Sequence, residues 1–207
     1  YLVVKGLGKY ERIGTTIDDA LGEAFDKTAK LLGLGFPGGP QIENFALNGN
    51  PNKFDLPKPI FYKGGCNLSF AGLKTAILRL KDSIKTKQDK CDLAASFQKT
   101  ILEIIKKKTT IAIDEYKRKN KSNTLVVAGG VSSNKEIRKT ISQLCKEKNM
   151  KPIFPNIDLC TDNAAMIAIV GLKKYKKKDF SKLTFNVKPR WSLDPKAKFL
   201  KGAGVIL

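Results

Sequence analysis

The strongest constraint on the fold is an apolar run, Thr124–Ala128, that ends at the glycine pair Gly129-Gly130. An unbroken apolar run of this length is typical of a strand that is buried on both faces of a sheet. A helix capped by Ser132 or Ser133 is expected next, and Pro152–Phe154 is expected to form a second buried strand. Strands that alternate with helices predict βαβ order and parallel pairing, so the fold class is α/β.

The first residues are expected to form two antiparallel strands, Leu2–Val4 and Tyr10–Ile13, around a glycine turn. This pair would make the sheet mixed. A helix with a capping-box-like start at Thr16 and Asp19 is expected to follow, and the turn Phe36–Pro40 ends it. Amphipathic helices farther along the chain would flank the sheet, the longest of them running through Leu93–Ile111.

Composition excludes several classes of site. The chain has no histidine, so it contains neither a histidine base nor a histidine-ligated metal. Its four cysteines form no C-x-x-C pair, and free thiols in a reducing cytosol are expected. No apolar run approaches the roughly 18 residues that span a bilayer, and nothing at the start resembles a secretory signal. A cytoplasmic protein without a membrane segment is therefore expected.

The net charge is +20, from 39 Lys and Arg against 19 Asp and Glu. A polyanionic partner such as RNA or DNA is one explanation of this imbalance. The other is that lysine runs such as Lys106–Lys108 and Lys176–Lys178 are solvated helix faces. Composition alone leaves both interpretations open.

Four residues of the first predicted helix, Asp19, Gly22, Glu23 and Asp26, share one face at helical spacing. An acidic stripe of this kind usually faces solvent. A glycine inside a helix costs about 1 kcal/mol, however, so its presence here indicates that something packs against this face. A ribose suits it, because one carboxylate can accept hydrogen bonds from both hydroxyls. The turn Pro37–Pro40 could offer backbone N–H groups to the same ligand.

Two further segments could contact a ligand. The glycine turn before Asn134 opens a helix whose N-terminus favours anions, although such turns are common. Asp162 lies in the first turn of another predicted helix, where an acidic residue ordinarily complements the helix dipole. A carboxylate at a helix start can also ligate a metal.

The chain carries five motifs in a fixed order: Ile17–Lys27, Pro37–Pro40, Leu68–Thr75, Ala128–Asn134 and Cys160–Met166. Together they closely resemble the catalytic subunits of tRNA threonylcarbamoyladenosine synthesis, a family once described as O-sialoglycoprotein endopeptidases. The resemblance extends from Tyr1 to about Leu193, and Val187–Trp191 is similar to the family's C-terminal tag. It implies an actin-like ATPase fold (ASKHA, ribonuclease-H-like), with residues 1–193 as the C-terminal lobe and 194–207 as a tail.

The resemblance also implies an activity. Members of the family are acyltransferases that move threonylcarbamoyl from threonylcarbamoyl-AMP to the exocyclic amine of the adenosine beside the tRNA anticodon. By motif match, Asp26, Gly39 and Asn134 would contact the adenine nucleotide, threonylcarbamoyl-AMP or ATP, and so would Glu43, a position that varies among relatives. Asp162 would be one ligand of a divalent metal, iron or zinc. The implied partners are tRNA, an inactive paralogue, a small ATPase and a separate enzyme that makes the adenylate.

The chain departs from the family pattern at its beginning. The family's two metal-binding histidines and its phosphate loop precede Tyr1, and so does most of the first lobe. The opening strand of the second lobe is also expected to be missing, from a place between Leu2–Lys5 and Thr124–Ala128. One carboxylate cannot hold a transition metal that needs three or four ligands, so residues 1–207 alone are expected to be inactive.

Two alternatives remain open. A sugar-kinase-like phosphotransferase of the same superfold would explain the glycine turns and Asp26, but not Asp162 or the segment Ser69–Thr75. A non-catalytic, basic remnant that binds RNA or a protein partner would explain the charge. A peptidase is not supported, because no histidine is available to activate a serine or cysteine.

Overall fold

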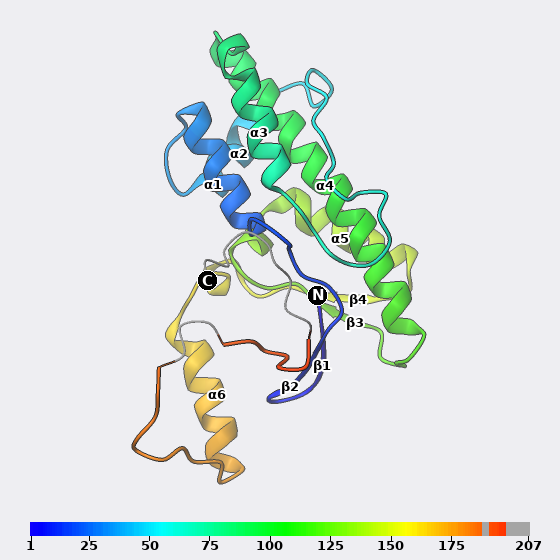
Figure 1. Ribbon diagram of the computed structural model, residues 1–207, viewed down its shortest axis with the longest axis vertical. Helices are drawn as coiled ribbons and strands as arrows, with labels where there is room; N and C mark the ends of the chain where they lie inside the picture. The colour runs from blue at the N-terminus through cyan, green and yellow to red at the C-terminus, as the bar shows by residue number, and fades with distance from the viewer. Residues whose placement is uncertain (188–190, 198–207) are drawn as a thin grey trace.

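Helices predominate over strands in the structure, a computed structural model that describes residues 1–187 and 191–197 (Figure 1). In this part of the chain the helices are α1 (Leu21–Leu32), α2 (Gly38–Ala46), α3 (Ala71–Leu80), α4 (Lys87–Lys117), α5 (Lys135–Glu147) and α6 (Ala164–Lys176). The strands are β1 (Leu2–Gly6), β2 (Lys9–Arg12), β3 (Thr124–Val126) and β4 (Lys151–Ile153). Short 3-10 turns lie at η1 (Lys81–Ser83), η2 (Gly130–Ser133) and η3 (Ile157–Leu159).

The long helix α4 organises the core. At its start the hydroxyl of Thr86 accepts a hydrogen bond from the backbone N–H of Asp89 (3.0 Å), and the Asp89 carboxylate accepts one from the Thr86 N–H (2.9 Å). Its apolar face is fully buried at Leu93, Phe97 and Ile101. Residues of α1, α2, α3 and α5 pack into the same core. The predicted amphipathic helix is therefore confirmed, and it is longer at both ends than its apolar pattern indicated.

Asp18 connects the segment before α1 to the start of α3. Its carboxylate accepts hydrogen bonds from the Ser69 hydroxyl and from the backbone N–H of Phe70 (2.7 Å). The backbone N–H of Ile17 donates to the carbonyl of Leu68 (2.8 Å) alongside. Two of the five sequence motifs thus bind each other, and this contact fixes where α1 begins relative to the core.

The expected single mixed sheet is wrong within the described residues. Strands β1 and β2 pair antiparallel, and β3 and β4 pair parallel, as predicted, but they form two separate two-stranded sheets. A cavity of about 320 Å³ lies between them, lined by Tyr1–Val4 on one side and by Thr124–Val126 on the other. Because no strand fills this cavity, Val126 is 61% exposed, although its apolar run predicted burial on both faces.

Three predicted helix starts are also wrong. The first helix begins at Leu21, after Ala20, and Thr16 instead donates its hydroxyl to the carbonyl of Asp19 (2.6 Å). Asn134, rather than Ser132 or Ser133, caps α5, and residues 130–133 form the turn η2. Asn163 caps α6, so Asp162, which was predicted to lie in the first turn of this helix, precedes it. In the last two cases an asparagine side chain that accepts the third N–H of the helix outcompetes a neighbouring hydroxyl.

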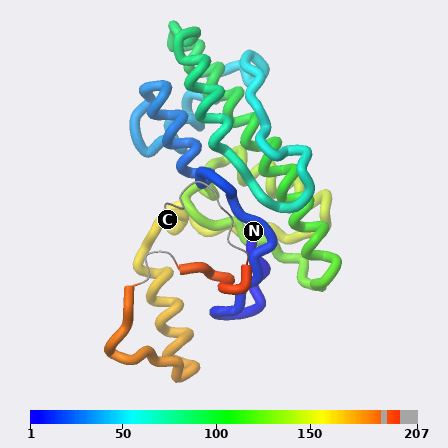
Figure 2. Tube along the Cα trace, in the orientation of Figure 1, coloured from blue at the N-terminus to red at the C-terminus, as the bar shows by residue number. Residues whose placement is uncertain are grey.

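Helix α6 extends away from the helices α1–α5 (Figures 1 and 2). None of its described residues is buried, and several large apolar side chains on it are exposed, namely Met166, Ile167, Ile169, Val170 and Leu172. Farther along, the Asp194 carboxylate accepts a hydrogen bond from the backbone N–H of Arg12 (2.8 Å). Residues 188–190 of the predicted C-terminal tag, and 198–207 of the predicted tail, lie outside the described residues. No helix in the described ranges is long and apolar enough to cross a membrane.

The four cysteines are all buried and free, as expected. Burial, together with a hydrogen bond to Glu115, raises the pKa of the Cys66 thiol to about 12. Burial also raises the pKa of the Cys145 thiol. Both side chains are therefore protonated at neutral pH and behave as parts of the core rather than as nucleophiles.

Candidate functional site

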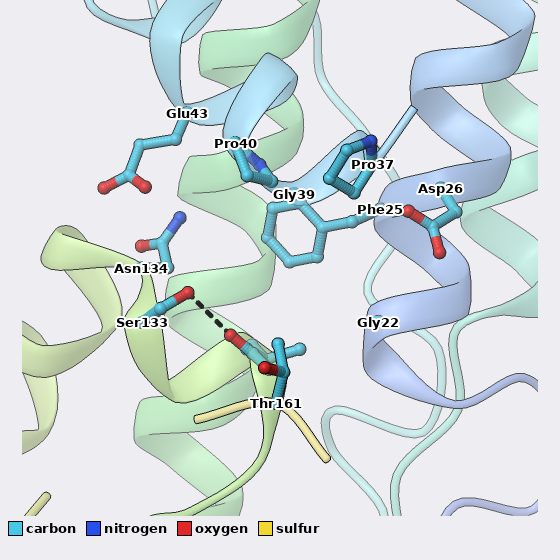
Figure 3. A pocket seen from close by; sticks show the side chains of 12 residues that line it. Gly22, Phe25, Asp26, Pro37, Gly39, Pro40, Glu43, Ser133, Asn134 and Thr161 are labelled. Carbon is cyan, nitrogen blue, oxygen red and sulfur yellow. Dashed lines mark hydrogen bonds between the residues drawn. The ribbon is translucent and has the colours of Figure 1, made fainter. Parts of the chain in front are cut away.

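A cavity of about 400 Å³ lies where α1, α2, the turn η2 and the segment after η3 meet (Figure 3). This volume falls in the range of small-molecule sites. Its lining residues are Gly22, Phe25, Asp26, Pro37, Gly39, Pro40, Glu43, Gly130, Val131, Ser133, Asn134 and Thr161. The four residues predicted to contact the nucleotide therefore share one cavity, namely Asp26, Gly39, Glu43 and Asn134.

The wall formed by α1 and α2 depends on a close backbone contact at Gly38. A Cβ atom at this position would lie 2.6 Å from the Cα of Asp26 and 2.8 Å from the carbonyl oxygen of Phe25. The Asp26 carboxylate accepts a hydrogen bond from the Gly38 N–H through Oδ1 (2.7 Å). Among the described residues Oδ2 has no hydrogen-bond partner, and Figure 3 shows the carboxylate at the edge of the cavity. One carboxylate oxygen thus holds the turn, and the other is available to a ligand.

Gly22 faces the turn η2 from α1. A Cβ atom on Gly22 would lie 3.6 Å from the Cγ2 atom of Val131, which is an ordinary contact distance. A methyl group would therefore fit at this position, and Gly22 lines the cavity without a close contact that requires a glycine. Two of the acidic residues predicted to share a helix face with Gly22 do not line the cavity: Asp19 and Glu23 both bind the Lys27 ammonium, at 2.7 and 2.8 Å.

Phe25, a buried residue that the sequence analysis did not single out, forms an apolar wall of the cavity. Its ring packs edge-on against Phe97, with centroids 5.2 Å apart and planes at 86°. The same side chain also lines the cavity (Figure 3). Pro37, Pro40 and Val131 complete the apolar lining. The signal that could have revealed Phe25 is its position three residues after Gly22, on the adjoining strip of the helix surface.

The N-terminus of α5 is occupied by protein groups. The amide oxygen of Asn134 accepts a hydrogen bond from the Ile137 N–H (3.0 Å), and its Nδ2 donates to Gln98 Oε1 (3.0 Å). The carboxylate of Glu43 accepts a hydrogen bond from the Lys135 N–H (2.7 Å). A negative charge is stabilised at this position by the helix dipole. Glu43 therefore supplies a negative charge at the N-terminus of α5.

The charge of the cavity is opposite to that of the protein. Its lining includes two carboxylates, Asp26 and Glu43, and no lysine or arginine. A ligand bound here therefore meets hydrogen-bond acceptors and apolar walls rather than cations. A neutral sugar and a flat base match such a lining, whereas phosphate groups do not.

Asp162 does not line the cavity, but its neighbour Thr161 does. The Asp162 side chain is exposed. Within residues 1–187 and 191–197, no group of three or more His, Cys, Asp or Glu side chains could hold a metal ion. The residues present therefore do not fit a complete metal site.

Alanine substitutions at the two glycines that begin α2 should affect stability differently. Gly38→Ala should lower the free energy of unfolding by about 1–3 kcal/mol, because its Cβ would collide with the backbone of α1. Gly39→Ala is the matched control, since a Cβ there has no atom within 4 Å. Thermal unfolding followed by circular dichroism measures both. Equal midpoints for the two variants would contradict the close contact at Gly38.

Comparisons with known proteins agree with the sequence motifs. The family model TsaD, described as tRNA N6-adenosine threonylcarbamoyltransferase, matches residues 1–169. A protein of this name from Pelagibacter ubique is 65% identical over 209 residues, covering 100% of this chain and 58% of the relative. A protein of the same name from Rickettsia rickettsii (strain Sheila Smith) is 50% identical, and the match covers 94% of this chain and 58% of the relative. Another from Ruegeria sp. is 46% identical, and the match covers 99% of this chain and 58% of the relative.

The chain thus spans 58% of the length of these relatives. The match includes every motif from Ile17 to Met166 and all the residues that line the cavity. This confirms the family that the motifs indicated: the chain belongs to the tRNA N6-adenosine threonylcarbamoyltransferase family.

Proposed function

We propose that this chain supplies the adenosine-binding part of a tRNA N6-adenosine threonylcarbamoyltransferase, an acyltransferase that uses threonylcarbamoyl-AMP. One observation carries the proposal. Asp26, Gly39, Glu43 and Asn134 come from three different segments and line a single cavity of suitable size. The name of the matching relatives supports the reaction.

The cavity suits the nucleoside portion of the adenylate. Asp26 Oδ2 would accept hydrogen bonds from the ribose hydroxyls while Oδ1 keeps its bond to Gly38. Gly39 has no side chain and has open space beside it, so a sugar can approach the backbone at the start of α2. The ring of Phe25 and the side chain of Val131 would contact the adenine.

The lining also orients the adenylate. Because Glu43 occupies the N-terminus of α5 and no cation lines the cavity, the phosphate end would point out of it. Thr161 lines the cavity, and Asp162 follows it directly. The reacting end of the molecule would therefore lie toward this segment and toward parts of the protein outside these residues. The same lack of cations disfavours a phosphotransferase such as a sugar kinase.

The proposed reaction is a group transfer from a mixed anhydride. The exocyclic nitrogen of the tRNA adenosine attacks the carbamoyl carbon, the bond from that carbon to the phosphate oxygen breaks, and AMP leaves with the electron pair. The attacking nitrogen loses one proton. This chain's residues would hold the AMP leaving group and fix its orientation. They would accelerate the transfer by positioning the donor, and not by acting as an acid or base in the cavity.

The proposal includes a divalent metal, iron or zinc, to which this chain would contribute one ligand. Asp162 would supply a single ligand, and the others would come from residues outside this chain, since the described residues do not complete a site. When bound, such a metal would act as a Lewis acid on the donor.

The proposed polyanionic partner is tRNA. The net charge of +20 supports it, as does the group of lysines in the last turn of α6, Lys173, Lys174 and Lys176. Lys173 and Lys176 are exposed, and Lys174 is partly exposed. A cytoplasmic location follows from a tRNA substrate. An inactive paralogue and a small ATPase remain proposed partners on the family resemblance.

Asp26→Asn tests the ribose contact. The amide keeps an oxygen for the Gly38 N–H but replaces the acceptor that faces the ligand, so affinity for AMP should fall by roughly 1–3 kcal/mol. Glu23→Gln is the matched control, because Glu23 lies on the same helix and binds Lys27 outside the cavity. Calorimetry of the complete protein measures both. Unchanged affinity in Asp26→Asn would contradict the assignment.

The transfer itself is tested with threonylcarbamoyl-AMP, tRNA and the proposed accessory proteins. Mass spectrometry should detect the modified adenosine with the complete protein and none with residues 1–207 alone, which offer one metal ligand. Turnover by the 207 residues alone would overturn the argument from metal ligands. No turnover by the complete protein would favour the non-catalytic, RNA-binding alternative.

A further inference from the structure

Arg138, in the second turn of α5, connects three segments near the cavity without lining it. Its Nε donates a hydrogen bond to the Ser132 carbonyl, and its Nη2 donates to the Pro155 carbonyl (2.7 Å). The guanidinium also lies over the ring of Phe154, 5.1 Å from its centroid. The side chain therefore fixes the end of η2 against the segment that follows β4.

Cys160 completes this cluster from the other side. Its thiol is buried, accepts a hydrogen bond from the Ser132 hydroxyl (3.3 Å), and lies 3.4 Å from Arg138 Nη2. The thiol itself donates to the Asn156 carbonyl (3.4 Å). Ser132, Arg138 and Cys160 thus form one hydrogen-bonded unit, and we refer to these three residues as the Arg138 cluster.

The Arg138 cluster joins the turn η2, which lines the cavity, to the segment that carries Thr161 and Asp162. The turn η2 contributes Gly130, Val131 and Ser133 to the cavity, and the segment 160–162 contributes Thr161 and carries Asp162. Among the described residues, one direct hydrogen bond joins residues 129–134 to 154–162, from Ser132 to Cys160. The other polar links between them pass through Arg138.

We propose that Arg138 is a positioning residue that, with Cys160, sets where the Thr161–Asp162 segment lies relative to a nucleoside bound in the cavity. This inference rests on the proposed function. Arg138 touches neither the cavity nor the reacting atoms, so it acts through the two segments it holds. Asp26 and the cap of α5 make their hydrogen bonds without the side chain of Arg138. The turn η2 also has two backbone hydrogen bonds of its own, from the Ser132 N–H to the Gly129 carbonyl (2.9 Å) and from the Asn134 N–H to the Val131 carbonyl (3.2 Å). Nucleoside binding is therefore expected to depend on Arg138 less than the alignment of the reacting end does.

The test separates kcat from affinity in the complete protein. In Arg138→Met the affinity for AMP should stay within about twofold, and kcat for threonylcarbamoyl transfer should fall about 10- to 100-fold, as expected for a small misplacement. Arg138→Lys keeps one donor and should recover part of the loss. Arg79→Met, a change at an exposed arginine on α3, is the control and should leave kcat unchanged.

Cys160→Ala provides a second, independent variant. It should lower kcat in the same direction, and adding it to Arg138→Met should cost less than the product of the two single effects, because the residues act as one unit. Retained AMP affinity shows that each variant is folded. If Arg138→Met does not fold, Arg138→Lys and Cys160→Ala carry the same comparison.

The possible failures are distinguishable. If the wild-type protein neither binds AMP nor transfers the group, the proposed function fails. If the wild-type protein is active and both Arg138→Met and Cys160→Ala keep wild-type kcat, the positioning inference is overturned. Parallel losses of AMP affinity and kcat would overturn it too, because they would show general disruption of the cavity.

Discussion

The contact of Gly38 with the backbone of Asp26 and Phe25 is the constraint on which the site depends. It brings α2 against α1, and the Asp26 carboxylate at the edge of the cavity then accepts the Gly38 N–H through one of its oxygens. The buried face of α4 supports this arrangement from behind, through the ring contact of Phe25 with Phe97. Core packing and ligand binding therefore share side chains on α1, and the position of the cavity follows from the packing of α1, α2 and α4.

The charge of the protein surface differs in sign from the charge of the cavity. The surface carries a large excess of positive charge, whereas the cavity contains carboxylates and no cation. Glu43 neutralises the helix end that would otherwise attract a phosphate. A nucleoside fits this lining, and a polyanion fits the surface. In the proposed complex, this acidic lining would keep the charged end of the leaving group out of the cavity, near the segment of Thr161 and Asp162 that the Arg138 cluster contacts.

Asp26 and Asn134 were predictable from motifs, because each is a polar residue close to a glycine in the sequence, and Gly39 was predictable from its place in a glycine turn. The helix caps were less predictable, since Ser132, Ser133 and Asn134 are adjacent and all of them are residue types that cap helices. The parallel pairing of β3 with β4 was predictable, but the separation of the two sheets could not be read from Thr124–Ala128, because an apolar run reports a preference for burial and not the presence of a second neighbouring strand. Arg138 carried no sequence signal, since its partners are carbonyls and a thiol distant in sequence.

Amide hydrogen exchange of the complete protein, with and without AMP, tests the central claim most directly. If the cavity binds the nucleoside, exchange should slow in peptides that cover residues 22–26, 37–43 and 130–134, which form its walls. Peptides that cover residues 48–56, a loop that lies against α4 outside the cavity, should not change. Protection confined to other parts of the protein, or equal protection of the loop and the walls, would contradict the account.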